Sequence, residues 1–223
     1  MRYLTKLTLL FFSFVSILTA HDNIGRVANF PNIPGYKTLA CDFHTHTVFS
    51  DGSVWPDIRV QEALKDQLDA IAITEHLEIQ NWKNDIPHSN RNRSFELASK
   101  YAKGSELIII NGSEITRKMT PGHSNAIFIK DANKLLIEEP SDIYVEAKKQ
   151  GAFIFWNHPH WIAQSPKREI PLDQMHLELI KNGLMHGIEV VNDTTYSDLF
   201  DFVFAIFLPL SFSSFILAFL IGF

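Results

Sequence analysis

Short apolar runs alternate with amphipathic segments along most of the chain. Runs rich in Ile, Val and Phe are typical of buried strands, whereas apolar residues at helical spacing are typical of helices that cover a core. We therefore expect a first strand at the start of segment 42–52. Further strands are expected at 69–74, 107–111, 125–129, 152–156 and 187–191. Between the strands we expect helices at 56–67, 94–103, 140–150 and 172–181.

The order of these elements predicts an α/β fold. Strands that alternate with helices form a parallel sheet with helices outside, either as an open sheet or as a barrel. Polar residues that could bind metal or act in catalysis follow several successive strands. A closed barrel directs the ends of its strands toward one centre more easily than an open sheet does. We therefore favour a barrel. Pro56 in the first turn of one helix, and Gly104 and Gly151 at the ends of two others, agree with these boundaries.

Both ends of the chain differ from this pattern. Residues 1–20 carry Arg2 and Lys6, then an apolar run, then Ala20 before a polar stretch, which predicts a secretory signal peptide cleaved near Ala20. An uncleaved anchor is the alternative. A cleaved signal peptide places the protein outside the cytoplasm, in the periplasm or secreted.

The other end, 202–223, has no charged residue and is rich in Phe. Its length permits a transmembrane helix and hence membrane association, but no Lys or Arg flanks it. Three interpretations stay open: a C-terminal anchor, an out-of-frame or fragmentary end, and a buried final element.

Length and charge narrow the class of protein further. The chain has 223 residues, 46% of them hydrophobic, which suits one catalytic domain with its own core. Loss of Arg2 and Lys6 with the signal peptide leaves 18 basic against 25 acidic residues, a formal charge of −7. No stripe of Lys and Arg is present, so we expect no nucleic-acid partner. The single cysteine, Cys41, cannot form an intrachain disulfide and is expected to be a buried small hydrophobe.

The strongest chemical signal is the pair His44 and His46. Residues i and i+2 of a strand project to the same face, so these imidazoles converge as two ligands of one cation must. Metal-capable side chains recur downstream, and in three of four cases they sit just past a short apolar run, where parallel-sheet enzymes place active residues. These segments are Thr-Glu-His at 74–76, Gly-Ser-Glu at 112–114, Gly-His at 122–123 and Asn-His-Pro-His at 157–160.

Together the ordered motifs resemble the polymerase and histidinol phosphatase (PHP) family of metal-dependent phosphoesterases. The match comprises His-x-His-x-x-x-Ser-Asp-Gly, Thr-Glu-His, Gly-x-Glu-Ile-Thr, Gly-His and Asn-His-Pro, in that order over 42–159. The resemblance implies a distorted barrel of seven strands, a (βα)7 barrel of the PHP type. An Asp-x-His pair that the family carries has no match after Val191, so the barrel is expected to lack its C-terminal strand or strands. The expected domains are a signal peptide at 1–20, a PHP-type hydrolase domain at 21–198 and a hydrophobic tail at 199–223.

The resemblance also implies two or three divalent metal ions. Imidazole and carboxylate ligands suit Zn²⁺, Mn²⁺ or Fe²⁺ and do not choose among them. The first site would take His44 and His46, and Glu114 would bridge it to a second site that His123 and His158 complete. Asp51 and His76 would serve a third. The implied metal ligands are His44, His46, Asp51, His76, Glu114, His123 and His158. Without the Asp-x-His pair, the first and third sites are each one ligand short.

The expected function is therefore that of an exported metal-dependent hydrolase, most plainly a phosphoesterase. A metal-activated water would attack a small phosphorylated or ester substrate, so no catalytic side chain beyond the metal ligands is needed. His160 and Trp161 are candidates for a substrate-binding wall. Glu75 is left out of the ligand set, His88 is expected to be exposed, and His176 and His186 are expected to be surface or packing residues.

Two alternatives stay open. One is a truncated, catalytically impaired relative that binds metal or ligand without turnover. The other is an amidohydrolase-type barrel, which also begins with His-x-His but would want a bridging lysine where this chain has Glu114.

Overall fold

The computed structural model describes residues 31–32, 34–167, 170, 172–189 and 192, and the backbone of 218–220. Its strands are β1 Leu39–Thr45, β2 Ala70–Ile73, β3 Ile108–Thr116, β4 His123–Ile127, β5 Phe153–Trp156, β6 Gly187–Ile188 and β7 Ala218–Leu220. Its helices are α2 Pro56–Lys65, α3 Arg93–Tyr101, α4 Pro140–Lys149 and α5 Gln174–Lys181, with a 3₁₀ turn η1 at Ala132–Leu135. Every expected helix and strand is present, and β3 runs beyond its expected end to Thr116.

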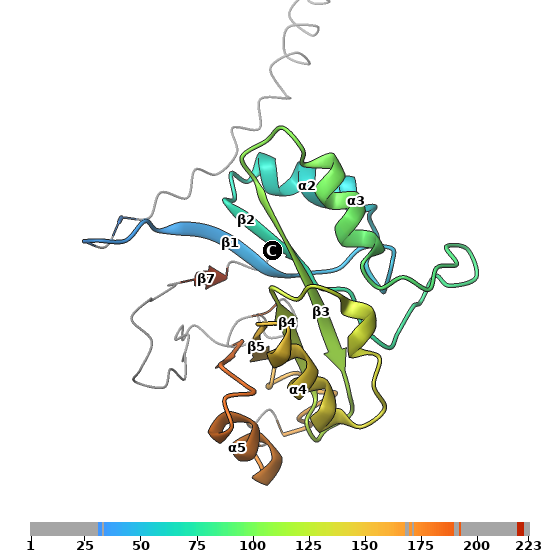
Figure 1. Ribbon diagram of the computed structural model, residues 1–223, viewed down its shortest axis with the longest axis vertical. Helices are drawn as coiled ribbons and strands as arrows, with labels where there is room; N and C mark the ends of the chain where they lie inside the picture. Colours follow the sequence, from blue (N-terminus) through green and yellow to red (C-terminus); the bar gives the residue numbers. More distant parts are fainter. Residues whose placement is uncertain are drawn as a thin grey trace, which may run out of the picture.

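Within the described part of the chain, the strands form one sheet in the order β6-β5-β4-β3-β2-β1-β7, curled into part of a barrel (Figure 1). Neighbours run parallel except at β4, which is antiparallel to both β3 and β5. The expectation of an all-parallel sheet is wrong at β4, because the link at 117–122 is too short for the crossover that parallel neighbours need. The fold is therefore α/β and barrel-like, but it does not follow one βα repeat throughout.

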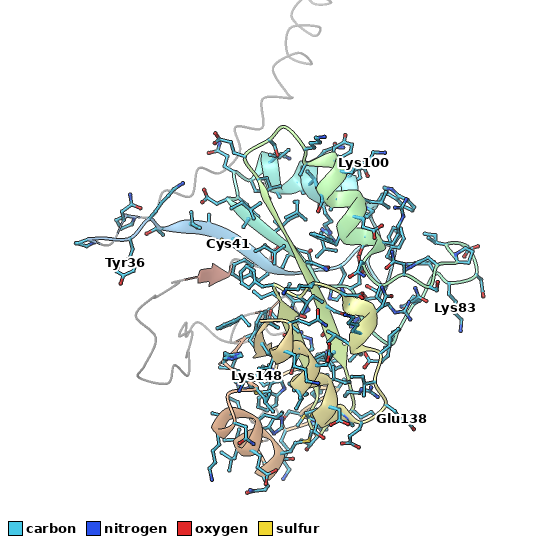
Figure 2. The ribbon with its side chains drawn as sticks, viewed as in Figure 1. Tyr36, Cys41, Lys83, Lys100, Glu138 and Lys148 are labelled. Carbon is cyan, nitrogen blue, oxygen red and sulfur yellow. The ribbon has the colours of Figure 1, made fainter. Side chains whose placement is uncertain are left out.

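Strand β2 shows how the two faces of the sheet are filled. Ile71 and Ile73 pack outward against α2 and α3, which lie together on that face (Figure 1). Ala70 and Ala72 point to the opposite, inner face, where they join Cys41 in a second apolar cluster. Successive side chains of β2 thus alternate between two apolar clusters, as expected for a strand that is buried on both faces. Cys41 is 5% exposed, which confirms the expected role as a small buried hydrophobe, and Figure 2 shows it on β1.

A third apolar cluster lies under α4 and α5 and holds the buried side chains of Tyr144, Trp156 and Leu179. His176 belongs to this part of the core: its ring stacks on Trp156 and its Nδ1 takes part in the cap of α5. That position agrees with a packing role. His88 is half-buried against Phe49, so the expectation that it is exposed is wrong.

The expected signal peptide at 1–20 and most of the tail at 199–223 lie outside the described residues. Within the tail, β7 pairs in parallel with β1, with Ala218 beside Leu39. Among the described residues, no helix has both the length and the apolar character needed to span a bilayer.

Candidate metal centre

The seven side chains expected to bind metal surround one cavity of about 470 Å³ at one end of the sheet. They reach it from different elements: the end of β1 and the loop after it, the loop after β2, the interior of β3, the start of β4 and the loop after β5. The residues are His44, His46, Asp51, His76, Glu114, His123 and His158. Side chains far apart in sequence therefore meet at one place.

A bulge in β1 turns His44 and His46 toward this cavity. Asp42 pairs with Ile71 and Thr45 with Ile73, so β1 takes three steps where β2 takes two. Residues in register share a face, and the extra residue shifts the alternation by one. Before the bulge Cys41 faces inward; after it Thr45 shares the outward face of Ile73, which leaves both histidines inward.

The reversed direction of β4 explains why His123 lies at the start of its strand whereas the other motifs lie at or after the ends of theirs. The start of β4 lies at the same edge as the ends of its parallel neighbours, and Thr116 pairs with His123 there. The same pairing extends β3, since Glu114 lies opposite Asn125. Glu114 was expected just past its strand and is instead held inside it, where its backbone is fixed on both sides.

Glu114 is at the centre of the site and is completely buried. Its two carboxylate oxygens face different partners. Around Oε2 lie His44 Nε2 at 3.6 Å, His46 Nε2 at 3.2 Å and His76 Nδ1 at 2.9 Å. Around Oε1 lie His123 Nδ1 at 3.0 Å and His158 Nε2 at 3.4 Å, and the Asn157 amide donates to it at 3.0 Å.

These residues fit a divalent cation. Oε2 of Glu114 is buried and makes no hydrogen bond, and His76 Nδ1 pairs instead with Thr116 Oγ1 at 2.6 Å. A buried carboxylate oxygen without a hydrogen bond is costly unless another positive partner takes it up. Three sets of ligand atoms lie within 4.8 Å of one another: His44, His46 and Glu114; His46, Asp51 and His76; and His76, Glu114 and His123.

The grouping matches the expected assignment at several points and departs from it at others. His44, His46 and Glu114 come together, and so do Asp51 and His76, as the motifs implied. His76 also reaches the set that contains Glu114 and His123, which was not expected. His158 approaches Glu114 but joins none of the three sets.

Acids and imidazoles in the site shift one another's pKa values. Burial favours neutral Glu114, but the imidazoles, His44 foremost, hold its pKa well below the usual value. Burial likewise opposes protonation of His44, yet the carboxylates of Glu189 and Glu114 raise its pKa well above 6.5. His76 is also disfavoured as a cation by burial, but Asp51 and Glu114 raise its pKa to about 10, and its hydrogen bond lowers that of Asp51 to about 2. Without metal, these shifts favour the charged forms of Glu114 with His44 and of Asp51 with His76.

Several residues that organise the site were not foreseen from the sequence. The buried carboxylate of Glu189 contacts His44 Nδ1 at 2.9 Å, and Gln164 contacts His158 Nδ1 at 2.7 Å. His158 has a positive φ of 30°, an unusual conformation for a residue with a side chain. Glu75, which was left out of the ligand set, accepts hydrogen bonds from the Thr47 backbone and from nearby hydroxyls, so it holds the loop after β1.

The wall of the cavity carries groups that could contact a substrate. Trp161 lies edge-on to the rings of His123 and His158, with centroids 5.6 and 5.2 Å away. His160 is not part of the cavity lining. Among the described residues of the lining, Arg59 is the only Lys or Arg. Its Nε donates to the His46 carbonyl and its Nη1 to the carboxylate of Glu62, each at 2.8 Å.

Comparison with known proteins agrees with this geometry. A family model described as the PHP domain matches residues 42–191, more than half of the chain. A two-domain protein of Bacteroides vulgatus, described as containing a predicted PHP-like metal-dependent phosphoesterase, is 52% identical with a TM-score of 0.71 over 74% of this chain and 47% of its own. The chain thus spans about half the length of that relative.

Two more distant proteins are similar to the chain. A crystal structure of a Bifidobacterium adolescentis protein is 16% identical with a TM-score of 0.51, over 72% of this chain and 80% of its own, which supports the fold alone. An uncharacterized protein of Methanocaldococcus jannaschii is 41% identical over 75 residues, which is 34% of this chain and 33% of that protein.

Proposed function

The chain belongs to the PHP domain family, and we propose that it is a metal-dependent hydrolase that cleaves a small phosphoester. The observation that carries this proposal is the buried Glu114, with imidazoles against each of its two carboxylate oxygens and no hydrogen bond at Oε2. A carboxylate so placed is suited to bridge two cations. Zn²⁺, Mn²⁺ and Fe²⁺ all suit the surrounding ligands.

Divalent cations bound there would supply the charge that activates water and stabilises the oxygen that leaves. The chain's own residues would hold those cations and exclude competing ligands. His44, His46 and Glu114 form one candidate position, and His76 takes part in both of the others. No side chain needs to act as a nucleophile.

The proposed substrate is small and carries a phosphate or another ester. A cavity of about 470 Å³ admits a compact ligand, and Trp161 and Ile79 offer apolar surface beside the charged cluster. Nucleic acid is disfavoured by the net negative charge. Export, with the first 20 residues as a signal peptide, remains part of the proposal and accounts for the apolar run after Lys6.

A direct assay tests the proposed function. The purified protein is loaded with Mn²⁺, Zn²⁺ or, without oxygen, Fe²⁺, and is offered 4-nitrophenyl phosphate, bis(4-nitrophenyl) phosphate and 4-nitrophenyl acetate. We expect hydrolysis of at least one phosphoester that depends on metal and stops with a chelator. Bound metal of at least two equivalents without turnover of any ester would instead support a non-catalytic binding module.

Arg59 is expected to contribute to substrate affinity. A hydrogen bond to a charged group is worth about 1.5–3 kcal/mol, so Arg59→Gln should raise KM for a phosphate monoester about 10- to 100-fold if the guanidinium contacts the phosphate. Arg59→Lys is the matched variant: it keeps the charge but loses the Nε bond to the His46 carbonyl.

Steady-state kinetics separate the two roles of Arg59. A rise in KM confined to the glutamine variant reports contact with the anion, whereas a fall in kcat shared by both variants reports the support of His46. Unchanged KM in the glutamine variant would exclude contact between Arg59 and the substrate.

A further inference from the structure

Glu189 lies directly after β6 and is 2% exposed, and nothing in the sequence marked it as part of the site. Both of its carboxylate oxygens have partners. Oε1 lies 2.9 Å from His44 Nδ1, and Oε2 accepts the backbone N–H of His158 at 2.9 Å. One buried side chain thus joins a residue of β1 to the loop after β5.

We propose that Glu189 is a positioning residue that orients His44 toward the metal centre and fixes the backbone of His158 beside it. The inference rests on the proposed function only in assuming that a cation binds near His44, His46 and Glu114. Glu189 itself does not line the cavity, so it acts through the residues it holds. His44 Nε2 then points toward Oε2 of Glu114, 3.6 Å away.

The tautomer of His44 follows from this contact. An imidazole that binds a cation through Nε2 must carry its proton on Nδ1, and a carboxylate opposite Nδ1 selects that form. Asn192 Nδ2 is also near, at 3.5 Å from His44 Nδ1, but an amide N–H there would favour the wrong tautomer. The closer Oε1 of Glu189 therefore decides which nitrogen faces the cavity.

The backbone of His158 depends on the other oxygen. His158 has a positive φ of 30°, and its N–H points to Oε2 of Glu189. Its ring is held separately by Gln164, whose amide nitrogen lies 2.7 Å from Nδ1 and by the same argument places the ring proton on Nε2. Glu189 therefore fixes the backbone from which the ring of His158 reaches Oε1 of Glu114, at 3.4 Å.

Only a carboxylate can serve both partners. His44 Nδ1–H and His158 N–H are both donors, and a carboxylate offers an acceptor oxygen to each. In Glu189→Gln one of these donors must face an NH₂ group, which is itself a donor. If the amide oxygen keeps the hydrogen bond from the His158 N–H, the NH₂ group of the glutamine faces His44 Nδ1. That contact favours the His44 tautomer with the proton on Nε2, which blocks cation binding through Nε2.

The test compares Glu189→Gln with Glu106→Gln, the same chemical change at an exposed residue remote from the cavity. Titration calorimetry with Mn²⁺ or Zn²⁺ alone, without substrate, should show about a 10- to 100-fold loss of affinity for Glu189→Gln, in the range typical of residues that orient metal ligands. Glu106→Gln should bind as the wild type does. Wild-type affinity in Glu189→Gln would overturn the proposal.

A second measurement needs no turnover. In Zn²⁺-loaded wild type with ¹⁵N-labelled histidine, long-range NMR correlations should show His44 protonated on Nδ1, and in Glu189→Gln this signature should be lost. A wild-type His44 protonated on Nε2 would also overturn the proposal. If the wild type binds metal with this signature but hydrolyses no ester, the proposed function fails while the positioning role of Glu189 stands.

Discussion

Replacement of Glu114 by Gln should leave the protein unable to hold two equivalents of metal and lower kcat/KM by about 10³-fold or more. Glu114 is the residue that every candidate histidine approaches: three imidazoles face Oε2 and two face Oε1. The amide keeps the shape of the side chain but loses its charge, and it places a donor NH₂ group against one set of imidazoles. Loss of a metal contribution worth several kcal/mol corresponds to a rate loss of this order.

The Glu114 prediction is measured by metal content after dialysis and by kinetics on the best phosphoester. Glu106→Gln is again the matched control, because Glu106 is exposed and far from the cavity. Circular dichroism establishes that each variant is folded. A Glu114→Gln protein that retained two equivalents of metal and normal kcat/KM would show that Glu114 does not bridge cations.

Much of the candidate site could be predicted from the sequence because its candidate ligands occur in short motifs at strand ends. Apolar runs located the strands, and residues just past them were candidates for the same edge of the sheet. That reasoning brought His76 and His158 correctly to the neighbourhood of Glu114. The family resemblance added the expectation that Glu114 is central.

What the sequence could not reveal depends on contacts between distant strands. His44 and His46 were expected to share a face, but whether that face is inner or outer depends on the bulge between Asp42 and Thr45. The bulge is a property of how β1 pairs with β2, and local sequence does not encode it. The length of β3 likewise depends on the antiparallel partner that carries His123.

Glu189 was missed for a related reason. It lies within the apolar run 187–191, where a lone carboxylate is typical of a strand residue that faces solvent. Its burial becomes apparent only once β6 lies beside β5, with the Glu189 N–H bonded to the Trp156 carbonyl. Asn157 is comparable: it is part of a recognised motif, but its amide bond to Glu114 is a tertiary contact.

Raising the pH from 6 to 8 should strengthen cation binding by about 10²- to 10⁴-fold. Without metal, the pKa of His76 is raised to about 10, so this imidazole is protonated across the whole range, and the pKa of His44 is raised well above 6.5, so it is protonated over at least the lower part. A cation binds only neutral imidazole, and each proton it displaces changes the apparent affinity tenfold per pH unit. Glu114 and Asp51 add no pH dependence, because their lowered pKa values keep them ionised.

Calorimetry of Mn²⁺ binding in two buffers of different ionisation enthalpy counts the protons released. We expect about two at pH 7, about one in His76→Asn, and no change in His88→Asn, since His88 is outside the cavity lining. Affinity that does not vary with pH would mean that the metal-free site holds neutral imidazoles and that the charged pairs do not form.

The stability of the metal-free protein should show the opposite trend with pH. A group whose pKa is raised by folding contributes stability that is fully present below its unfolded pKa, about 6.5 for histidine, and that is lost as the pH rises through the folded value. For His76 that window extends from about 6.5 to about 10. With a chelator the melting temperature should therefore fall between pH 6.5 and 8.5, whereas with Mn²⁺ in excess it should rise, because tighter binding stabilises the folded state. Parallel trends in the two series would show that the charged pairs and the cation do not compete for the same side chains.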